Sequence, residues 1–515
     1  MILRTISSKL SAADKMSQWL RQAHHEEPIM YFKSLTITNF KSFESKQKIT
    51  FSKGINYIVG DNNCGKSTIV DALRYLIENV GEQSSLRNKS ATEDLSVEAV
   101  FAGQDLINIV QSDKYEKLAK YLNDDHEEPY FRVRRSPKVE TITQGRKTVT
   151  LDGKKITFWN PDTQKFENPT GIDALFRSLV DLVPVLADTT TSEIVDFGST
   201  KTLGKLISVI SQRFQESPKW KAFQDAHATA FSDGEESLSS LTEDVTSQVE
   251  SLVQAQYGTA KVRFDFNLPD ATTFIKGGQL LVTDGNYETP LCDKGTGMQR
   301  AVTLALIQVY SNMQHRTKEH APLTLLLDEP ETWLHPRAQI QLGEALTKIS
   351  EDEQLFLITH SPYMLRSYQP KQHRLLIFSR DNNVPSIQYS DKLGLIANQA
   401  PSLGEITYFA FGIPSAEFHD ELWGEIHCRI DPGSESGLNR VLNEKYGFDY
   451  KKTWIREGKK GQKSESATIP YYIRNSSHHP ENRLNDPYTD NELAESTENL
   501  IAVLKALQST QVSNP

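Results

Sequence analysis

Gly60-Asp-Asn-Asn-Cys-Gly-Lys-Ser-Thr68 contains the complete pattern G-x-x-x-x-G-K-S. An apolar run at residues 54–60 precedes the loop and suits a buried strand. Residues 68–79 follow it, with apolar side chains at helical spacing. Strand, glycine-rich loop and helix in this order form a site where backbone N–H groups and a helix N-terminus bind phosphate. The sequence therefore predicts an α/β fold with a P-loop.

The residue types in this loop predict ATP and Mg²⁺ as ligands. Lys66 would reach the β- and γ-phosphates, and the Ser67 hydroxyl would hold Mg²⁺. The glycines let the backbone curl around a phosphate, and the alternative is a chance glycine-lysine turn. The predicted nucleotide-binding residues of the loop are Gly60, Asp61, Asn62, Asn63, Cys64, Gly65, Lys66, Ser67 and Thr68.

Two further apolar runs end in polar residues that would complete the site. Residues 323–327 lead into Asp328, expected to bind Mg²⁺, and Glu329, expected to orient or deprotonate the attacking water. Residues 354–359 lead into His360, which would contact the γ-phosphate. An acidic strand cap and a structural histidine are the alternatives, and the order of the segments favours the site. The predicted catalytic residues are thus Lys66, Glu329 and His360, and the predicted metal ligands are Ser67 and Asp328.

The order of these segments resembles the ABC-type ATPase superfamily, and within it the SMC-like and OLD-like heads. Residues 31–43 resemble the first strand pair of those heads, and residues 328–336 resemble their Walker B motif and D-loop. This resemblance implies the fold class: an α/β ABC-type P-loop ATPase head, here with a helical or mixed insertion that would act as a lid and a mostly helical C-terminal region. It also implies that the chain is an ATPase.

Gly295-Thr-Gly-Met-Gln299 resembles the signature motif of this superfamily, whose usual form is Leu-Ser-Gly-Gly-Gln. A threonine replaces the serine and a methionine replaces one glycine. Through the resemblance, Thr296, Gly297 and Gln299 are expected to cover the nucleotide bound to the other subunit; a glycine turn before a helix is the alternative. ATP would then join two heads and hydrolysis would release them. Because the chain carries one set of motifs, we expect it to pair with itself.

The amino-acid composition indicates which class of protein this is. The 515 residues are 37% hydrophobic and 24% charged, which is typical of a globular chain of roughly two to four domains. No apolar run approaches the ~18 residues of a membrane span, so we expect a cytoplasmic protein. Three cysteines are too few for a disulfide framework. The net charge of −10 argues against a general nucleic-acid coat. Local basic patches occur at 132–135 and at 451–463, where solvated faces are the favoured interpretation.

The chain divides into five expected parts. Residues 1–29 have no secretory pattern and are interpreted as an N-terminal extension before Met30. Residues 30–101 form the first ATPase lobe and end in a strand at 95–101. Residues 102–260 are an insertion, with strands at 130–135 and 147–151 and helices at 172–182, 203–214 and 238–256. Residues 261–385 form the second lobe, with an entry strand at 262–266, and residues 386–515 form a C-terminal partner-docking region.

Two phrases of the C-terminal region, residues 403–423 and 468–482, look like the tail of the ATPase subunit of Septu-type and retron-associated antiphage systems. This resemblance implies a separate HNH-type nuclease as partner, with retron RNA or DNA or phage nucleic acid as a further partner. The apolar side chains expected to anchor docking at the surface are Phe409, Phe411, Phe418, Leu422, Trp423, Tyr471, Tyr472 and Ile473. Burial against the ATPase core is the alternative.

Arg474 and His479 have the Arg-x4-His spacing of HEPN-type ribonucleases, in which histidine is the base and arginine holds phosphate. The same segment fits a helix stop at Pro480, or a His/Glu metal cluster. Three functions therefore remain: an ATP-driven sensor and scaffold that controls a nuclease partner, a self-contained ATP-regulated nuclease, and a DNA-repair head of the RecF or SMC type. No second acidic cluster resembles a TOPRIM nuclease.

Overall fold

The computed structural model describes residues 30–512, except 125–127, 139, 145–146, 152–154, 169–170, 187–203, 205–206, 208–210, 212–213, 232–236, 259–260, 263, 265, 267, 269–272, 274–277, 315–322, 382–383, 390–394, 397–400 and 459–460. The predicted N-terminal extension lies outside the described residues. The chain divides into two compact units, residues 1–187 with 320–515, and residues 188–319.

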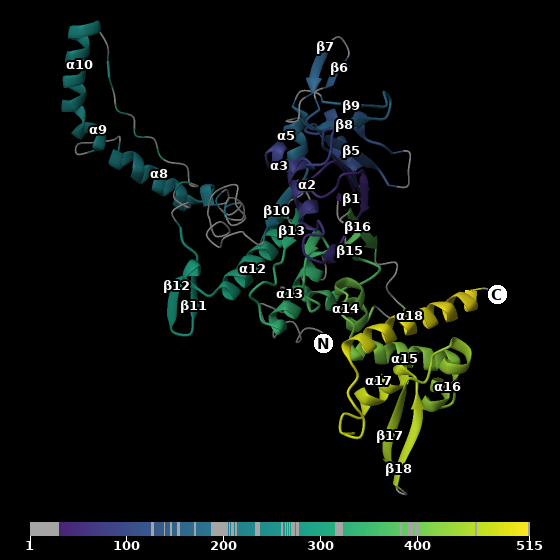
Figure 1. The fold of residues 1–515 in the computed structure, drawn as a ribbon. Helices are drawn as coiled ribbons and strands as arrows, with labels where there is room; N and C mark the ends of the chain where they lie inside the picture. The colour runs from purple at the N-terminus through teal and green to yellow at the C-terminus, as the bar shows by residue number, and fades with distance from the viewer. Residues whose placement is uncertain are drawn as a thin grey trace, which may run out of the picture. The chain divides into compact units, whose positions relative to one another are not determined.

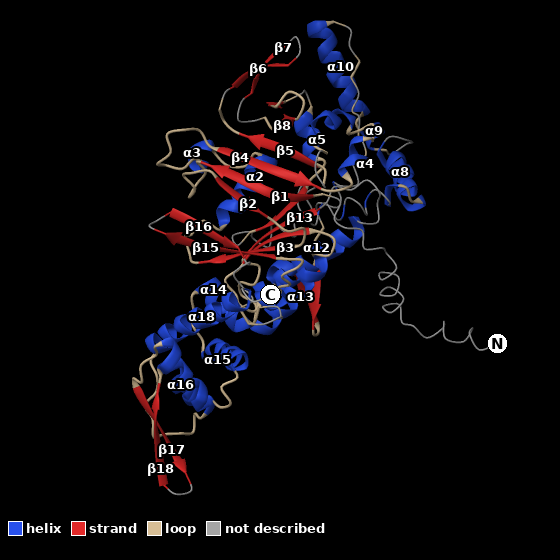
Figure 2. Ribbon diagram, turned by 90° about the vertical axis from the view of Figure 1, so that its right-hand side faces the viewer, coloured by secondary structure: helices blue, strands red, loops and turns tan. Residues whose placement is uncertain are grey.

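A six-stranded, mostly parallel sheet carries the predicted nucleotide site in the first unit (Figures 1 and 2). Only the edge pair β15–β16 is antiparallel. The sheet is built from β10 (Asp181–Val185), β13 (Leu323–Asp328), β14 (Gln354–Ile358), β3 (Ile55–Gly60), β15 (Arg374–Asp381) and β16 (Val384–Tyr389), in that order. Every residue of β3 and β14 is buried, which explains their continuous apolar sequences. The carboxyl ends of β3, β13 and β14 meet at one edge.

A second, antiparallel sheet extends further along the chain than we expected. Its strands, in order, are β2 (Gln47–Thr50), β1 (Tyr31–Thr38), β4 (Ser96–Ala102), β5 (Tyr130–Arg135), β8 (Thr157–Asn160) and β9 (Lys165–Glu167). Because β5 pairs with β4 over six residues, the predicted strand at 130–135 is part of the first lobe and not of a separate lid. The boundary at residue 101 was therefore placed too early. The buried Gln354 side chain joins the sheets by bonding both backbone groups of Phe32, at 2.8 and 2.9 Å.

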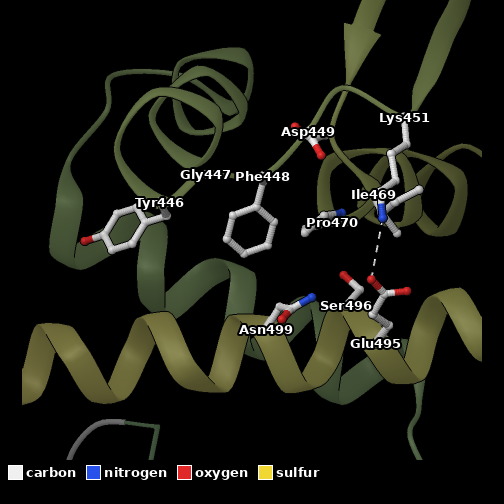
Figure 3. Close-up of a pocket in the computed structure, with 10 residues that line it drawn as sticks. All are labelled: Tyr446, Gly447, Phe448, Asp449, Lys451, Ile469, Pro470, Glu495, Ser496 and Asn499. Atoms are coloured by element: carbon white, nitrogen blue, oxygen red, sulfur yellow. Dashed lines mark ion pairs between the residues drawn. The ribbon is translucent and has the colours of Figure 1, made fainter.

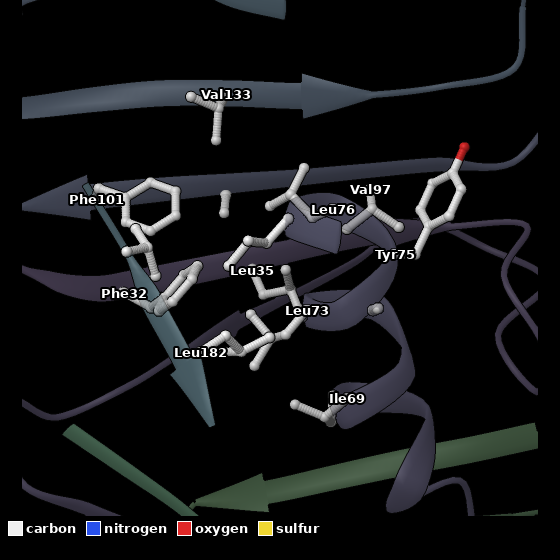
Figure 4. Close-up of a cluster of buried hydrophobic side chains, with 14 of the residues drawn as sticks. Phe32, Leu35, Ile69, Leu73, Tyr75, Leu76, Val97, Phe101, Val133 and Leu182 are labelled. Carbon is white, nitrogen blue, oxygen red and sulfur yellow. The ribbon is translucent and has the colours of Figure 1, made fainter. Parts of the chain in front are cut away.

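Helix α2 (Ser67–Glu78) packs into a hydrophobic core shared with side chains of both sheets. Figure 4 shows Ile69, Leu73 and Leu76 of this helix among residues of β1, β4 and β5. The helix ends where Asn79 adopts a left-handed conformation. The remaining elements of this part are α3 (Gln83–Leu86), α4 (Leu106–Val110), η1 (Glu116–Tyr121), β6 (Glu140–Gln144), β7 (Lys147–Leu151), α5 (Ile172–Arg177), α13 (Pro336–Ile349) and η3 (Met364–Ser367).

The described residues of the second unit form helices and one hairpin. Its described elements are α8 (Pro218–Phe231), α9 (Leu238–Leu241), α10 (Glu243–Tyr257), β11 (Leu281–Asp284), β12 (Tyr287–Pro290), η2 (Leu291–Asp293) and α12 (Thr296–Gln314). The helix expected at 238–256 is confirmed as α9 and α10. The helix expected at 172–182 is shorter, because the apolar residues from 181 join the parallel sheet as β10. The prediction at 203–214 lies largely outside the described residues. Of the entry strand expected at 262–266, residues 262, 264 and 266 are described, and none of them is in a strand.

The C-terminal region forms a module with its own core. It contains α14 (Leu403–Phe411), α15 (Ala416–Ile430), α16 (Glu435–Tyr446), β17 (Lys452–Gly458), β18 (Gly461–Ala467), α17 (Ile469–His478) and α18 (Asp490–Val512). Ser402, Ser415, Ser434 and Thr468 each cap a helix with a side-chain oxygen. In the described part of the chain, no helix is long and apolar enough to cross a membrane.

Most of the aromatic and aliphatic side chains expected to be docking anchors are buried inside this module. The buried members are Phe418, Leu422, Trp423, Tyr471, Tyr472 and Ile473. The prediction of exposed anchors was therefore wrong for these residues. A small independent core requires apolar side chains just as a docking surface does. Here these side chains pack α15, α16, α17 and α18 together. Phe409 and Phe411 are half-buried.

Candidate functional site

The P-loop connects β3 to α2, and its two glycines are required by geometry. Gly60 has φ +128°, and a Cβ there would lie 1.9 Å from the carbonyl oxygen of Phe378 in β15. Gly65 has φ +98°, and its Cβ would lie 2.6 Å from the Ser42 hydroxyl. Both positions combine left-handed backbone with a close neighbour, so any side chain would disturb the loop. The loop geometry therefore requires glycine at both positions, and phosphate binding by its backbone stays a prediction.

Lys66 is held inside the loop. Its Nζ donates hydrogen bonds to the backbone oxygens of Gly60, at 2.9 Å, and Asp61, at 2.7 Å. Burial lowers the pKa of Lys66, and the carboxylates of Glu329 and Asp328 act in the opposite direction. The ammonium group is therefore positioned where a nucleotide's phosphate oxygens can replace the backbone carbonyls as partners.

A cavity of about 580 Å³ opens at the carboxyl edge of the parallel sheet. It is lined by Lys41, Ser42, Asn62, Asn63, Gly65, Lys66, Ser67, Thr68, Asp71, Asp328, Glu329, Ile358, His360 and Arg380. The structure therefore brings the three predicted segments together around one space. The Cys64 side chain turns away into the core, where its thiol donates to the Asp61 carbonyl at 2.7 Å, and burial raises its pKa.

The acidic wall of the cavity comes from the end of β13. Asp328 is its last residue and is in register with Ile358 of β14. Glu329 follows with φ +47°, and its backbone N–H donates to the Ile358 carbonyl at 2.9 Å. This strained turn points the Glu329 carboxylate toward His360, with 3.6 Å between Oε1 and Nε2. Burial, followed by the charge of Lys66, lowers the pKa of His360, so the imidazole is neutral at pH 7.

Ser67 and Asp328 both line the cavity, so the predicted magnesium ligands can face one ion. A hydroxyl and a carboxylate are oxygen donors of the type that Mg²⁺ prefers, and a bound nucleotide would supply phosphate oxygens. The donor set therefore fits the predicted metal. Across the described residues, no group of three or more His, Cys, Asp and Glu side chains is arranged to hold a metal ion without a nucleotide.

Glu331 is a site residue that the sequence reasoning missed. Its side chain is 5% exposed, and Oε1 accepts from the Thr359 hydroxyl at 2.5 Å and from the His360 backbone N–H at 3.1 Å. The other oxygen, Oε2, is buried without a hydrogen-bond partner. Burial raises the pKa of this carboxyl above its ordinary value. The carboxyl thus ties the turn after β13 to the turn that carries His360.

A second missed group comes from the loop after β1. Lys41 forms an ion pair with Asp71 of α2, and the Ser42 hydroxyl lies 3.0 Å from that of Thr68. Arg380 reaches the cavity from β15. The sequence provides little indication that these residues belong to the site, because short polar loops occur throughout the chain. Only the pairing of β1 with its neighbours brings this loop against the P-loop.

The signature-like segment belongs to the second unit. Helix α12 begins at Thr296, and Gln299 is buried, donating from Nε2 to the carbonyls of Cys292 at 2.8 Å and Lys294 at 2.7 Å. Gly297 lies within the first turn of the helix. The segment thus forms a helix N-terminus with a braced preceding turn. Contact of Thr296, Gly297 and Gln299 with a nucleotide remains a prediction.

Arg474 and His479 have separate acidic partners. Arg474 donates to Glu435 at 3.1 Å and lies 3.9 Å from Asp420. His479 lies 3.3 Å from Glu481, on the turn that follows α17. The helix ends at His478, two residues before Pro480, as the helix-stop interpretation predicts. The His/Glu cluster does not form a metal site.

Comparison with known proteins agrees with this geometry. A family described as "AAA domain" matches residues 34–252, and one described as "AAA ATPase domain" matches residues 187–365. Together these matches span the P-loop, Asp328, Glu329 and His360. The matched residues are thus similar to AAA ATPase domains. Its sequence is similar to the Old nuclease of Escherichia phage P2, with 28% identity over 351 residues that cover 64% of this chain and 56% of the phage protein.

Shorter matches occur to chromosome partition proteins. The Smc protein of Myxococcus xanthus is 50% identical over 56 residues, which is 11% of this chain and 4% of that protein. The chain thus spans about half of the phage relative and a small part of the Smc protein. Among solved structures, the SMC head domain from Thermotoga maritima has a TM-score of 0.34 at 16% identity, covering 69% of this chain and 98% of that one. The sequence matches are thus to an Old nuclease and to Smc proteins.

Proposed function

We propose that this chain hydrolyses ATP at the cavity described above and uses the nucleotide to pair with a second copy of itself. The observation that carries the proposal is the convergence of Lys66, Glu329 and His360 on one cavity. Lys66 would neutralise the β- and γ-phosphates as the bond between them breaks. Ser67 and Asp328 would hold Mg²⁺, which neutralises phosphate charge when bound.

Glu329 is the proposed base in this reaction. Its carboxylate would orient a water toward the γ-phosphorus and accept its proton as the P–O bond to ADP breaks, leaving inorganic phosphate. The neutral His360 beside it would donate a hydrogen bond to the γ-phosphate. Thr296, Gly297 and Gln299 would cover the γ-phosphate on the partner copy, so that neither copy has a complete site alone. ATP would then favour pairing, and hydrolysis would release the pair.

We further propose that, in the cytoplasm, the chain is the sensor and scaffold subunit of an antiphage complex that controls a separate HNH-type nuclease. The likeness to Septu-type and retron-associated tails motivates this assignment, and the name of the phage relative adds a link to nuclease biology. The engagement of Arg474 by Glu435 favours it over a self-contained nuclease, because a phosphate-holding arginine must be available to substrate. The C-terminal module, which has its own hydrophobic core, would dock the nuclease.

Co-purification tests this proposal. The tagged chain is expressed from its native operon, and mass spectrometry identifies the proteins retained with it. Recovery of an HNH-type nuclease in stoichiometric amount is the expected result. Cleavage of RNA or DNA by the chain alone, lost in His479→Ala, would replace the proposal with the self-contained nuclease. ATP-dependent binding to gapped DNA or DNA ends, with no nuclease recovered, would replace it with a repair ATPase of the RecF or SMC type.

A further inference from the structure

The hairpin of β17 and β18 carries basic residues in two groups that differ in their partners. At its base, Lys452 pairs with Glu492 at 2.7 Å. Lys451, just before β17, pairs with Glu495 at 3.6 Å beside a cavity of about 190 Å³ (Figure 3). Both carboxylates come from α18. The positive charge at the base is therefore neutralised within the module.

Further along the hairpin, two exposed cations lie opposite each other. Arg456 of β17 is the direct antiparallel partner of Lys463 of β18. Like charges at directly opposed positions destabilise a two-stranded ribbon. None of the described carboxylates forms an ion pair with either side chain, although both lysines at the base have one. The hairpin thus has two like charges opposite each other without an ion pair to a described carboxylate, whereas the lysines at its base are each paired with a carboxylate.

The position of this pair leaves it accessible. Trp454 anchors the hairpin, since it is 4% exposed and its ring lies edge-on to Tyr472 of α17, with 5.7 Å between centroids. Arg456 is two residues beyond Trp454 and therefore on the same face of the ribbon, but exposed. Figure 1 shows the hairpin extending away from α15, α16 and α17. Lys459 and Lys460, next in the sequence, lie outside the described residues.

In the other basic patch of the sequence, residues 132–135, arginines bind groups of the same chain. Arg132 binds Glu98 through two nitrogens, at 2.5 and 3.1 Å. Arg135 is 1% exposed and donates to the Leu76 carbonyl at 2.9 Å. Those arginines stabilise the first lobe. In a chain of net charge −10, the Arg456–Lys463 pair, which no described carboxylate joins in an ion pair, is therefore a local feature that suits an anionic partner.

We propose that Arg456 and Lys463 bind the phosphate backbone of double-stranded DNA, with the β17–β18 hairpin as the contact arm. A duplex presents one negative charge per ~1.7 Å of its axis, so two neighbouring cations can engage phosphates at any register. Its major groove, about 12 Å wide, admits a two-stranded β-ribbon. The hairpin would thus be the surface that contacts the nucleic-acid partner, and this contact requires neither ATP turnover nor a nuclease. Its failure would leave the proposed function standing.

Fluorescence anisotropy tests the proposal with the full chain and a fluorescein-labelled duplex of about 40 base pairs, over about 50 to 200 mM salt. The test variant is Arg456→Gln with Lys463→Gln. The matched control is Lys451→Gln with Lys452→Gln, which removes the same charge from the base of the same hairpin. Unchanged ATP turnover and melting temperature in both variants establish that they fold.

The expected result is a slope of log affinity against log salt that is smaller by about two in the test variant, about one for each lost phosphate contact. The affinity gap to the wild-type chain should then narrow roughly tenfold across that salt range. The control variant should retain the wild-type slope. No duplex binding by the wild-type chain, or equal losses in both variants, would overturn the proposal. Tighter binding of polyglutamate or of the single strand than of the duplex would also overturn it, in favour of an acidic protein or single-stranded nucleic acid.

Discussion

Replacing Glu331 by alanine tests whether the buried carboxylate positions the turn that carries His360. The change removes the acceptor of two hydrogen bonds, from the Thr359 hydroxyl and the His360 N–H. A hydrogen bond to a charged group contributes about 1.5–3 kcal/mol. If one such bond holds His360 in place during hydrolysis, its loss lowers kcat by roughly 10- to 150-fold, because each ~1.4 kcal/mol is tenfold in rate. Glu331→Gln keeps an oxygen acceptor and should lose less than tenfold.

Glu353 provides a matched control at the opposite end of the same strand. It is 1% exposed and accepts from the backbone N–H of Leu323, the first residue of β13, at 2.9 Å. Glu353→Ala should lower the melting temperature as Glu331→Ala does, but leave kcat within about twofold, since it is remote from the cavity. Phosphate release at saturating ATP gives kcat, and a thermal melt gives stability. Equal kcat in Glu331→Ala and wild type would refute the positioning role.

The pH dependence of stability tests the same residue independently. Burial raises the pKa of Glu331 above its ordinary value of 4.5, so the folded state holds this proton to higher pH than the unfolded state. Stability from this group is fully present below pH 4.5 and is lost as pH rises through the folded-state pKa. Glu331→Gln removes that loss. The melting temperature of Glu331→Gln minus that of wild type should therefore increase with pH above this value, and a pH-independent difference would contradict the raised pKa.

Three further substitutions test other parts of the account. Lys66→Ala removes the charge that neutralises the β/γ-phosphates, so ATP affinity or turnover should collapse, and wild-type values in calorimetry and phosphate release would overturn the P-loop assignment. Gly297→Glu brings a carboxylate toward the partner's γ-phosphate, so ATP binding should survive while turnover is lost. Normal turnover there would make residues 295–299 a structural turn only. His479→Ala should leave ATPase activity intact and weaken partner-dependent defence in a plaque assay, and an unaltered defence phenotype would argue against a docking role.

The core of the nucleotide site could be predicted from the sequence because each part is local. A glycine-rich loop between an apolar run and a helical pattern determines its own geometry, and Gly60 and Gly65 occupy the left-handed conformations that the motif requires. Asp328 and His360 line one cavity, as expected because the ends of parallel strands meet at one edge, and their roles stay predictions. Residues such as Ser42 and Arg380 could not be placed, because their proximity depends on pairings between distant strands.

The errors have physical causes. Residues 130–135 alternate buried and half-buried side chains, which predicts a strand but not its neighbour, so the first sheet was ended too early. Trp423 and Tyr471 were interpreted as interface anchors because apolar composition is the same for an interface and for a core. Glu331 was overlooked because the sequence alone does not show whether an acidic side chain after the Walker B strand points into the interior or into the cavity. Only the packed structure shows that it turns inward to Thr359.

Glu329→Gln tests the central claim most directly, that the chain hydrolyses ATP with Glu329 as base. The variant keeps Asp328 and the whole P-loop, so ATP should bind with wild-type affinity while phosphate release falls by at least ~10²-fold. Light scattering should then show an ATP-dependent pair of chains that persists, where the wild-type pair dissociates as ATP is consumed. Wild-type phosphate release by Glu329→Gln would contradict the account, because the proposed base would then have no part in hydrolysis.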